Sequence, residues 1–396
     1  RNANMTNLEQ SLNPTITAMA PDKLLNFQKT VRDIPGVLKL TFGEPGFDVD
    51  ERIKAAATEA INNNRSHYAE SQGEQSLRAE AVRYFNETYH LNYQDEDNVI
   101  VTLGVSEGIN VVLHTLLAPG DGLLVPEPAY GPYFTSLALA YGQKIAIDTT
   151  AHRFKLTPEM VDEAVEKATV PVRAILMNYP TNPTGVTYSR EEVMALAATF
   201  KKHHIWVISD EIYAVLTYDQ AHVSFAEIIP EQTIYINGLS KSHAMTGYRV
   251  GFILASKQMI LEMQKVHGAL TFAIPTFIQD AAVVALRDVK DTPLLMRAAY
   301  KARRDRILPQ LKALGFDVVT PEGAFYIFAK MPVDLGDDGD AFALNLAREG
   351  KVAVIPGSGF SESAKAFIRI SYAASDEDLD EGMKRITAYV KRLREK

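Results

Sequence analysis

Several side chains able to bind or transform a small molecule stand at the ends of short, strongly apolar runs of the sequence. Ligands of an open parallel sheet bind beyond the carboxyl ends of its strands, so these positions are expected to meet in one crevice. They supply a carboxylate, two cationic groups, an amide and the start of a helix: Gly104-Val105-Ser106, Asn182, Asp210, Lys241 and Arg249. The combination indicates a site that binds an anion, holds a buried acid and carries a reactive lysine.

The turn at Gly104-Val105-Ser106 has the features of a phosphate site. It joins an apolar run to a helical pattern, so free backbone N–H groups and the positive end of a helix dipole are expected there. Ser106 adds a hydroxyl donor, and Arg249 offers a planar fork of donors that suits the same phosphate. Taken alone, each feature also fits a plainer interpretation: a tight glycine turn, and a surface ion pair for Arg249.

Asp210 and Lys241 indicate what else the ligand carries. Asp210 closes an apolar run, where an unpaired carboxylate is costly, so it needs a protonated ring nitrogen, a structural ion pair or a helix to cap. Most lysines are solvated, but Lys241 stands in a Ser- and Gly-rich turn, where a lysine can lose its proton and form a Schiff base with an aldehyde. A phosphate, a ring nitrogen and a Schiff-base lysine together describe pyridoxal 5′-phosphate (PLP).

The elements expected to position these residues are those of an α/β protein. Apolar runs bounded by Gly, Pro or Asn alternate with helical patterns, which is typical of a mainly parallel sheet covered by helices on both faces. Residues 106–117 and 193–200 carry the helical spacing of apolar residues. The predicted strands are NVIVTLG (98–104), GLLVP (122–126), RAILMNYP (173–180), HIWVISD (204–210), TIYINGLS (233–240) and RVGFILA (249–255).

After about residue 290 the pattern changes to that of a second, smaller α+β domain. A charged helix is expected from Met296 to Leu314, followed by short strands within 317–330 and 366–372 and a closing helix from Ser375. We therefore predict three parts of the chain. They are an N-terminal arm that belongs partly to the small domain (5–45), a large PLP-binding α/β domain (46–290) and a small C-terminal α+β domain (291–396).

The composition argues against several classes of protein. The 41 Lys and Arg against 49 Asp and Glu give a net charge of −8, which disfavours binding to nucleic acid or anionic lipid. The absence of cysteine excludes disulfides, Cys-ligated zinc and thiol nucleophiles. An intracellular enzyme can fold and function without them. No apolar stretch reaches the roughly 18 residues of a membrane span. We expect a cytoplasmic enzyme without a metal, nucleic-acid or membrane partner, and we expect Arg1–Asn4 to be foreign to its fold.

The segment GLSKSHAMTGYRVG (238–251) matches the lysine signature of class I/II aminotransferases, the fold type I PLP enzymes. The resemblance extends from about Leu12 along essentially the whole chain, and within the family it is strongest to the aromatic amino acid and N-acetyl-LL-diaminopimelate aminotransferases. It implies transfer of an amino group from an L-amino acid to a 2-oxo acid such as 2-oxoglutarate, in a ping-pong cycle. The other matching motifs, highly specific together, are FGEPGF (42–47), YAESQGEQSLR (68–78), NYPTNPTG (178–185), SDEIY (209–213), PEGAFYIF (321–328) and FIRIS (367–371).

The resemblance implies roles for the residues around the cofactor ring. Lys241 would hold PLP as a Schiff base and move the substrate proton, and Asp210 would keep the pyridine nitrogen protonated. Asn182 and Tyr213 would hydrogen-bond the 3-oxygen of the ring. Tyr130, in the sequence EPAY, would stack on the ring face.

The resemblance also implies how the charged ends are bound. Arg369 would clamp the substrate α-carboxylate with help from the Gly43 backbone; a guanidinium inside the apolar run FIRIS needs an anion in any case, although an internal ion pair is the alternative. Tyr68 would reach the phosphate from the other subunit of a homodimer with shared active sites. The remaining phosphate ligands would be Val105, Ser106, Ser240 and Arg249.

Two departures from the family bear on the substrate. Several aspartate-specific relatives carry a lysine where this chain has Ser106, and many aspartate enzymes carry tryptophan where it has Tyr130. We therefore expect an aromatic or N-acetyl-LL-diaminopimelate-like donor. Aspartate aminotransferase specificity and a PLP-dependent β-C–S lyase of the same fold are the alternatives.

Two other enzyme classes are more remote alternatives. GVSEG (104–108) fits the G-x-S-x-G elbow of a serine hydrolase with Ser106 as nucleophile. That fold needs a late histidine, however, and the last one in this chain is His267. A dinucleotide-dependent oxidoreductase is disfavoured because no G-x-G-x-x-G follows a predicted strand.

Overall fold

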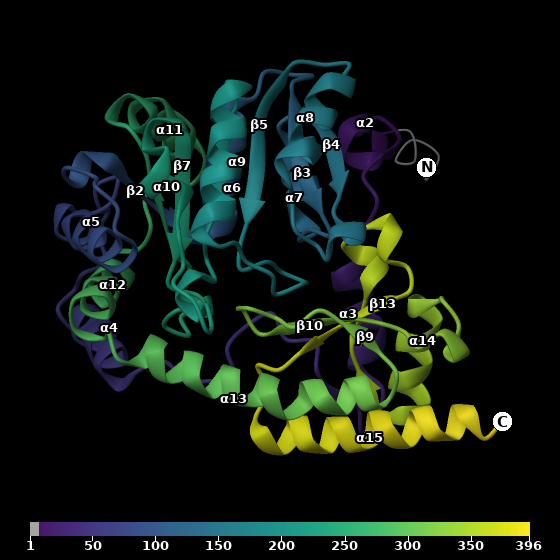
Figure 1. The fold of residues 1–396 in the computed structure, drawn as a ribbon. Coiled ribbons are helices and arrows are strands. Elements are labelled where there is room, and N and C mark those ends of the chain that lie inside the picture. Colours follow the sequence, from purple (N-terminus) through teal and green to yellow (C-terminus); the bar gives the residue numbers. More distant parts are fainter. Residues whose placement is uncertain (1–7) are drawn as a thin grey trace.

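A computed structural model describes residues 8–396, so the expectation for Arg1–Asn4 lies outside the described residues. Figure 1 shows two bodies, each built around its own sheet: a larger one between layers of helices, and a smaller one flanked by two long helices near the C-terminus. Within residues 8–396 no helix is long and apolar enough to cross a membrane.

The larger body is built on a seven-stranded sheet. Its strands are β2 (Val99–Leu103), β3 (Gly122–Glu127), β4 (Gln143–Asp148), β5 (Val172–Asn178), β6 (Trp206–Asp210), β7 (Thr233–Gly238) and β8 (Val250–Leu254). Their order is β2-β8-β7-β6-β5-β3-β4, and β7, β6, β5, β3 and β4 are parallel neighbours. β8 runs antiparallel to both β2 and β7. The carboxyl ends of the parallel strands therefore lie along one edge of the sheet.

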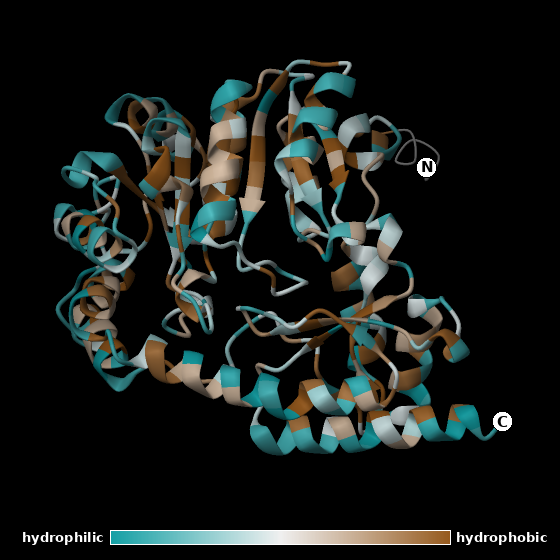
Figure 2. Cartoon of the chain, viewed as in Figure 1, coloured by the Kyte–Doolittle hydropathy of each residue, from teal (hydrophilic) through white to brown (hydrophobic). Residues whose placement is uncertain are grey.

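Helices cover both faces of this sheet. They are α4 (Glu51–Asn62), α5 (Gln75–Tyr89), α6 (Gly104–Leu116), α7 (Pro132–Leu139), α8 (Pro158–Lys167), α9 (Arg190–Lys202), α10 (Phe225–Ile228), α11 (Lys257–Leu270) and α12 (Thr276–Asp288). Successive strand residues point to opposite faces, so Leu176 of β5 packs with α6, α7 and α11, whereas Ile175 and Met177 pack with α8 and α9. Hydrophobic residues accordingly concentrate on the strands and the inner sides of the helices (Figure 2).

The smaller body contains a four-stranded antiparallel sheet in the order β12-β13-β10-β9. Its strands are β9 (Asp317–Val318), β10 (Tyr326–Lys330), β12 (Ile355–Pro356) and β13 (Phe367–Ser371), and its helices are α13 (Thr292–Ala313), α14 (Gly339–Asn345) and α15 (Asp376–Arg394). Buried apolar residues of this sheet and of all three helices form one core. Ser375 caps α15 by accepting a hydrogen bond from the Asp378 N–H, as the sequence predicts for a helix that begins there.

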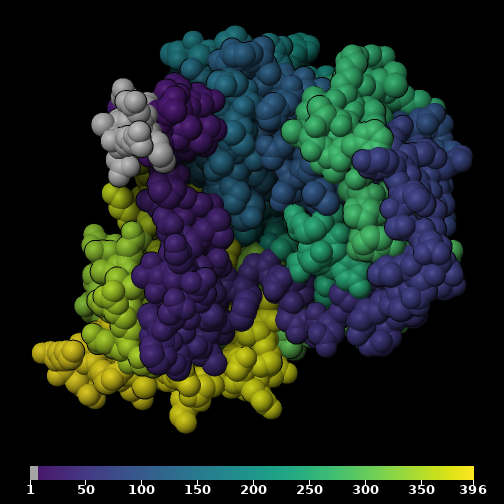
Figure 3. All heavy atoms as spheres, turned by 180° about the vertical axis from the view of Figure 1, so that it is seen from behind, coloured from purple at the N-terminus to yellow at the C-terminus, as the bar shows by residue number. Residues whose placement is uncertain are grey.

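The N-terminal arm connects the two bodies. It contains α2 (Pro14–Thr17), α3 (Lys23–Arg32) and β1 (Leu38–Lys39), and β1 pairs in parallel with β11 (Val352–Ala353) of the C-terminal part. Phe27 and Val31 of α3 pack against apolar residues of that part. Figure 3 shows the arm, in purple, passing over the surface between the blue-teal body and the yellow-green body. α3 is thereby held beside the crevice between the two bodies.

The predicted fold class is confirmed, because a mainly parallel sheet lies between helices and a smaller α+β unit follows it. The six predicted strands form within three residues of their expected bounds. β4 was missed because it is an exposed edge strand without a continuous apolar run. The antiparallel direction of β8 was not predicted either, since an apolar run does not encode strand direction. The division at residues 45 and 290 stays a prediction.

Candidate active site

A cavity of about 330 Å³ opens beyond the carboxyl ends of β5, β6 and β7. All predicted site residues except Tyr68 line it: Gly43, Val105, Ser106, Tyr130, Asn182, Asp210, Tyr213, Ser240, Lys241, Arg249 and Arg369. Leu24 and Gln28 of α3 complete the wall from the side of the arm. Among residues 8–396, no group of three or more His, Asp or Glu side chains is arranged to hold a metal ion.

One end of the cavity is an anion cradle at the start of α6. No side chain of the residues that the structure describes caps the N–H groups of the first turn of this helix, so these donors are free for a ligand. Gly104 adopts a φ of +73°, and a Cβ there would lie 2.7 Å from a terminal nitrogen of Arg249. The left-handed backbone favours glycine at this position, and the absence of a Cβ leaves the guanidinium room against the helix start. Free N–H groups and a cation at one point favour a bound phosphate.

Asp210 lies at the end of β6 and is buried. Its Oδ2 accepts a hydrogen bond from the Tyr133 hydroxyl, and its Oδ1 accepts one from the Ile212 N–H at 3.2 Å. Both partners are neutral. Burial raises the pKa of Asp210 to about 6, against the opposing effect of the Tyr133 hydrogen bond. This carboxyl is stabilised as a carboxylate by any cationic N–H that enters the cavity.

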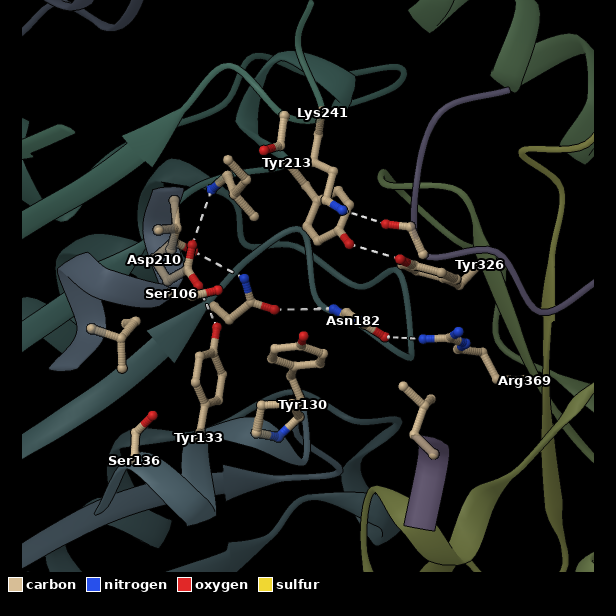
Figure 4. A pocket seen from close by; sticks show the side chains of 18 of the residues that line it. Ser106, Tyr130, Tyr133, Ser136, Asn182, Asp210, Tyr213, Lys241, Tyr326 and Arg369 are labelled. Atoms are coloured by element: carbon tan, nitrogen blue, oxygen red, sulfur yellow. Dashed lines mark hydrogen bonds between the residues drawn. The ribbon is translucent and has the colours of Figure 1, made fainter. Parts of the chain in front are cut away.

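Lys241 follows β7 and extends into the cavity (Figure 4). Its Nζ donates a hydrogen bond to the Gly43 carbonyl and lies 5.8 Å from the centre of the Tyr213 ring. Burial lowers the pKa of Lys241 to about 8. A neutral amine, which is the form able to attack an aldehyde, is therefore accessible near neutral pH.

Arg369 occupies the opposite wall and is only 1% exposed. Its Nη1 donates to Asn182 Oδ1 at 2.9 Å, its Nη2 donates to the Thr41 carbonyl at 3.0 Å, and its Nε has no partner among the described residues. The Tyr326 ring lies 4.3 Å from the guanidinium carbon. All of these contacts are to neutral groups, so the buried cation lacks a counter-charge that a carboxylate ligand would provide.

A chain of hydrogen bonds connects these two walls of the cavity (Figure 4). Asn178 Nδ2 donates to the Asp210 carbonyl at 3.0 Å, and Asn178 Oδ1 accepts from the Asn182 N–H at 3.0 Å. Asn182 then accepts from Arg369. Tyr213 and Tyr326 share a separate hydroxyl–hydroxyl hydrogen bond of 2.7 Å. The acid, the amide and the guanidinium are thus held in fixed relative positions before a ligand binds.

Comparison with known proteins shows the family to which this chain belongs. Residues 35–386 match the model for aminotransferase class I and II. The chain belongs to this family. A probable N-acetyl-LL-diaminopimelate aminotransferase of Bacillus subtilis is 38% identical over 388 residues, or 98% of each chain. Aromatic-amino-acid aminotransferase 2 of Thermococcus litoralis is 32% identical, covering 96% of this chain and 98% of that protein.

A solved structure of Thermus thermophilus aspartate aminotransferase with maleate matches the fold of this aminotransferase. The TM-score is 0.90 at 32% identity, over 96% of this chain and 99% of that one. The expected fold type and the enzyme class, a PLP-dependent transaminase, are therefore confirmed. The serine hydrolase alternative is wrong, and His267 hydrogen-bonds Glu107 and the Ser71 carbonyl rather than Ser106.

Some residues that line the aminotransferase site were not predicted. Asn178 and Tyr326 lie inside the motifs NYPTNPTG and PEGAFYIF, which marked the family without a role for these two positions. Tyr133 lies on α7, just after the EPAY segment that ends at Tyr130, and no motif assigned it a role. Leu24 and Gln28 gave no signal, because their place in the wall depends on how the arm packs.

Tyr68 is the one predicted residue that lies outside the cavity of its own chain. Its side chain is 90% exposed, and its ring contacts the edge of Phe272 at 5.1 Å between centroids. Gly43 also differs in detail from the expectation, because its carbonyl accepts from Lys241. The contribution of Tyr68 to a second subunit stays a prediction.

Proposed function

We propose that this aminotransferase moves the amino group of an aromatic or N-acetyl-LL-diaminopimelate-like L-amino acid to a 2-oxo acid such as 2-oxoglutarate. The observation that carries the donor preference is the set of cations in the cavity. Among the described lining residues these are Lys241, Arg249 and Arg369. The cofactor and the substrate α-carboxylate would engage all three, so the described part of the chain would offer no further cation to a distal carboxylate. Gln28 is a neutral donor on the arm side that could contact a polar distal group.

The residues of the cavity fit PLP. The free N–H groups at the start of α6 and the adjacent Arg249 suit its phosphate, with Val105, Ser106 and Ser240 beside them. Asp210, buried with only neutral partners, suits its protonated ring nitrogen. The lowered pKa of Lys241 suits covalent attachment of this amine to the aldehyde of PLP.

PLP, when bound, supplies an electron sink for the carbon from which the amino group leaves. Lys241 would attach the cofactor and then, once released by the incoming amine, move the proton between the substrate Cα and the C4′ atom of the cofactor. Burial assists this step because it keeps the lysine pKa near the working pH. Asp210 would hold the proton on the ring nitrogen, oriented by the hydroxyl of Tyr133.

The walls of the cavity would orient the ring and the substrate. Tyr130 would stack on the ring, while Asn182 and Tyr213 would hydrogen-bond its 3-oxygen. Arg369 would bind the α-carboxylate as a planar fork, because its Nε is without a partner and its cation is not neutralised by the protein. Tyr326 supports this guanidinium from one face.

We further propose a homodimer with shared sites, in which Tyr68 binds the phosphate held by the partner subunit. The exposure of Tyr68 outside its own cavity supports this arrangement. The enzyme is proposed to act in the cytoplasm, without a nucleic-acid or membrane partner.

Mixed dimers test the shared site. A Lys241→Ala chain paired with a Tyr68→Ala chain places both defects in one site and leaves the other intact. Recovery of cofactor retention and activity over both parent homodimers is expected. No recovery would mean that Tyr68 acts within its own chain.

Steady-state kinetics over a donor panel tests the substrate. With 2-oxoglutarate as acceptor, tyrosine, phenylalanine or N-acetyl-LL-diaminopimelate is expected to exceed aspartate in kcat/KM by about tenfold. This factor corresponds to roughly 1.4 kcal/mol, about the free energy of the one charged hydrogen bond that the distal carboxylate of aspartate would lack. The opposite order would establish aspartate specificity. Release of pyruvate and ammonia from cysteine conjugates, with slow transamination of every donor, would establish the β-C–S lyase.

A further inference from the structure

A buried histidine lies between two elements that border the phosphate cradle. His267 of α11 is 0% exposed. Its Nδ1 lies 2.8 Å from Glu107 Oε1, in the first turn of α6, and its Nε2 lies 2.7 Å from the Ser71 carbonyl, in the loop that carries Tyr68. One imidazole therefore contacts both the helix that starts the cradle and the loop proposed to complete the cradle of a second subunit.

The contact with Glu107 has an electrostatic consequence. Glu107 follows Ser106 directly, and its Oε1 also accepts a hydrogen bond from the Leu103 N–H at 3.2 Å, so the carboxyl is fixed at the helix start. A carboxylate there would repel the phosphate that the cradle is built to bind. The Ser71 carbonyl can only accept a hydrogen bond, so Nε2 is the donor there, and the hydrogen bond between Nδ1 and Glu107 Oε1 places one further proton beside the carboxyl, which offsets its charge.

The contact between His267 and Ser71 fixes the loop of residues 67–73 against α11. Gln264, one turn earlier on α11, donates to Ser71 Oγ at 2.8 Å, and Ser71 Oγ donates to the Phe272 carbonyl. Phe272 carries the ring against which Tyr68 packs. Loss of the His267 donor would remove one of these three contacts of Ser71. The loop would then be held less firmly, and Tyr68 would be less well positioned.

We propose that His267 is a positioning residue that couples the phosphate cradle of its own subunit to the Tyr68 loop serving the partner's cradle. The proposal rests on the proposed function and on the shared site. It assigns two effects to one side chain: compensation of Glu107 within the subunit, and placement of Tyr68 across the dimer.

Binding of PLP and of unphosphorylated pyridoxal to the apoenzyme distinguishes this role from simple core packing. His267→Gln keeps the side chain close in size, but its single amide nitrogen can take the place of only one of the two ring nitrogens, so one of the two partners loses its contact. The dissociation constant of this variant for PLP is expected to rise on the order of tenfold, as for loss of one charged hydrogen bond, with that for pyridoxal unchanged. Equal weakening of both ligands, or of neither, would overturn the proposal. Absence of PLP binding by the wild-type chain would instead overturn the proposed function.

A second substitution keeps the test independent of folding defects. Glu107→Gln in the His267→Gln chain removes the uncompensated carboxylate and is expected to restore the part of the PLP affinity that is lost through α6, whereas the loss caused by a packing defect would persist in full. His203→Gln is the matched control, because His203 also pairs with a carboxylate, Asp162 at 2.6 Å, but directly after α9 and outside the lining of the cavity. It should leave both ligands unaffected.

Mixed dimers separate the two effects. When one chain carries Lys241→Ala, borohydride fixes PLP only in the site whose lysine is intact. His267→Gln in the chain with the intact lysine tests the α6 contact of that site, and His267→Gln in the other chain tests the Tyr68 loop. Weaker PLP retention in both arrangements is expected. An effect in only one arrangement would overturn the coupling between subunits.

Discussion

The charged residues of the cavity and those of the α13–α15 helix pair are satisfied in different ways. On the outer helices, Arg303 and Arg306 form ion pairs of 3.0 and 3.1 Å with Asp376, and Arg306 also pairs with Asp380 at 2.9 Å. In the cavity, Asp210 and Arg369 are buried and Lys241 is partly buried, yet the hydrogen-bond partners of all three are carbonyls, a hydroxyl, an amide and a backbone N–H.

Burial without a counter-charge is the costlier condition, so the cavity is where the fold alone leaves its charges incomplete. A ligand with a phosphate, a protonated ring nitrogen and a carboxylate would complete them. Substitutions in the two regions should therefore differ: the cavity residues should govern activity, and the outer ion pairs should contribute little to activity or stability.

The largest effect is expected for Lys241→Ala. Turnover should be abolished, because both the covalent attachment of the cofactor and the proton transfer at Cα reside on this amine. Single-turnover measurement of amino donor consumption checks it, with circular dichroism to verify folding. Substantial turnover by the folded variant would contradict the role assigned to Lys241.

Asp210→Ala is expected to lower kcat by roughly 10²- to 10³-fold while the fold persists. Loss of the partner of a buried charge costs about 3–5 kcal/mol, and each 1.4 kcal/mol is tenfold in rate. Stopped-flow or steady-state rates with the best donor measure the effect. Near-wild-type rates would show that another group holds the proton on the ring nitrogen.

Arg369→Gln should lower kcat/KM by about 10²-fold for the amino donor and for the 2-oxo acid alike, since both present a carboxylate to the same guanidinium. Arg306→Gln is the matched control, with the same chemical change on α13. A selective effect on only one of the two substrates would place the α-carboxylate elsewhere.

The apoenzyme offers a test of the burial of Lys241 by pH. Its folded-state pKa of about 8 lies below the ordinary 10.5, so the stability linked to this group is fully present above pH 10.5 and is lost as the pH falls through 8. The difference corresponds to roughly 3 kcal/mol. Lys241→Met should therefore be the more stable apoenzyme at pH 7 and should lose this advantage towards pH 10. Parallel denaturation curves at all pH values would contradict the buried ammonium.

The smallest effect is expected for Asp380→Ala on α15. Asp380 is 59% exposed, and surface ion pairs of this kind contribute about 0–1 kcal/mol. Urea denaturation should shift slightly at low salt and not at high salt, with kcat/KM unchanged. A change in donor kinetics would mean that this helix pair is coupled to the site.

The sequence predicted the cavity well where a site residue follows a buried strand. Asp210 and Lys241 could be placed in one crevice because strand order and direction bring carboxyl ends to one edge. Gln28 could not be placed there, because the sequence of an amphipathic helix in the arm does not show which part of the protein the helix packs against. His267 was noted only as the last histidine, because its contacts with Glu107 and Ser71 join positions 160 and 196 residues apart.

The most direct test of the account is borohydride reduction of the purified enzyme followed by peptide mapping. The account predicts a yellow protein whose colour is lost on reduction, with a single pyridoxyl adduct on Lys241. An adduct on any other lysine, or no adduct in enzyme saturated with PLP, would contradict the assignment of this cavity as the active site.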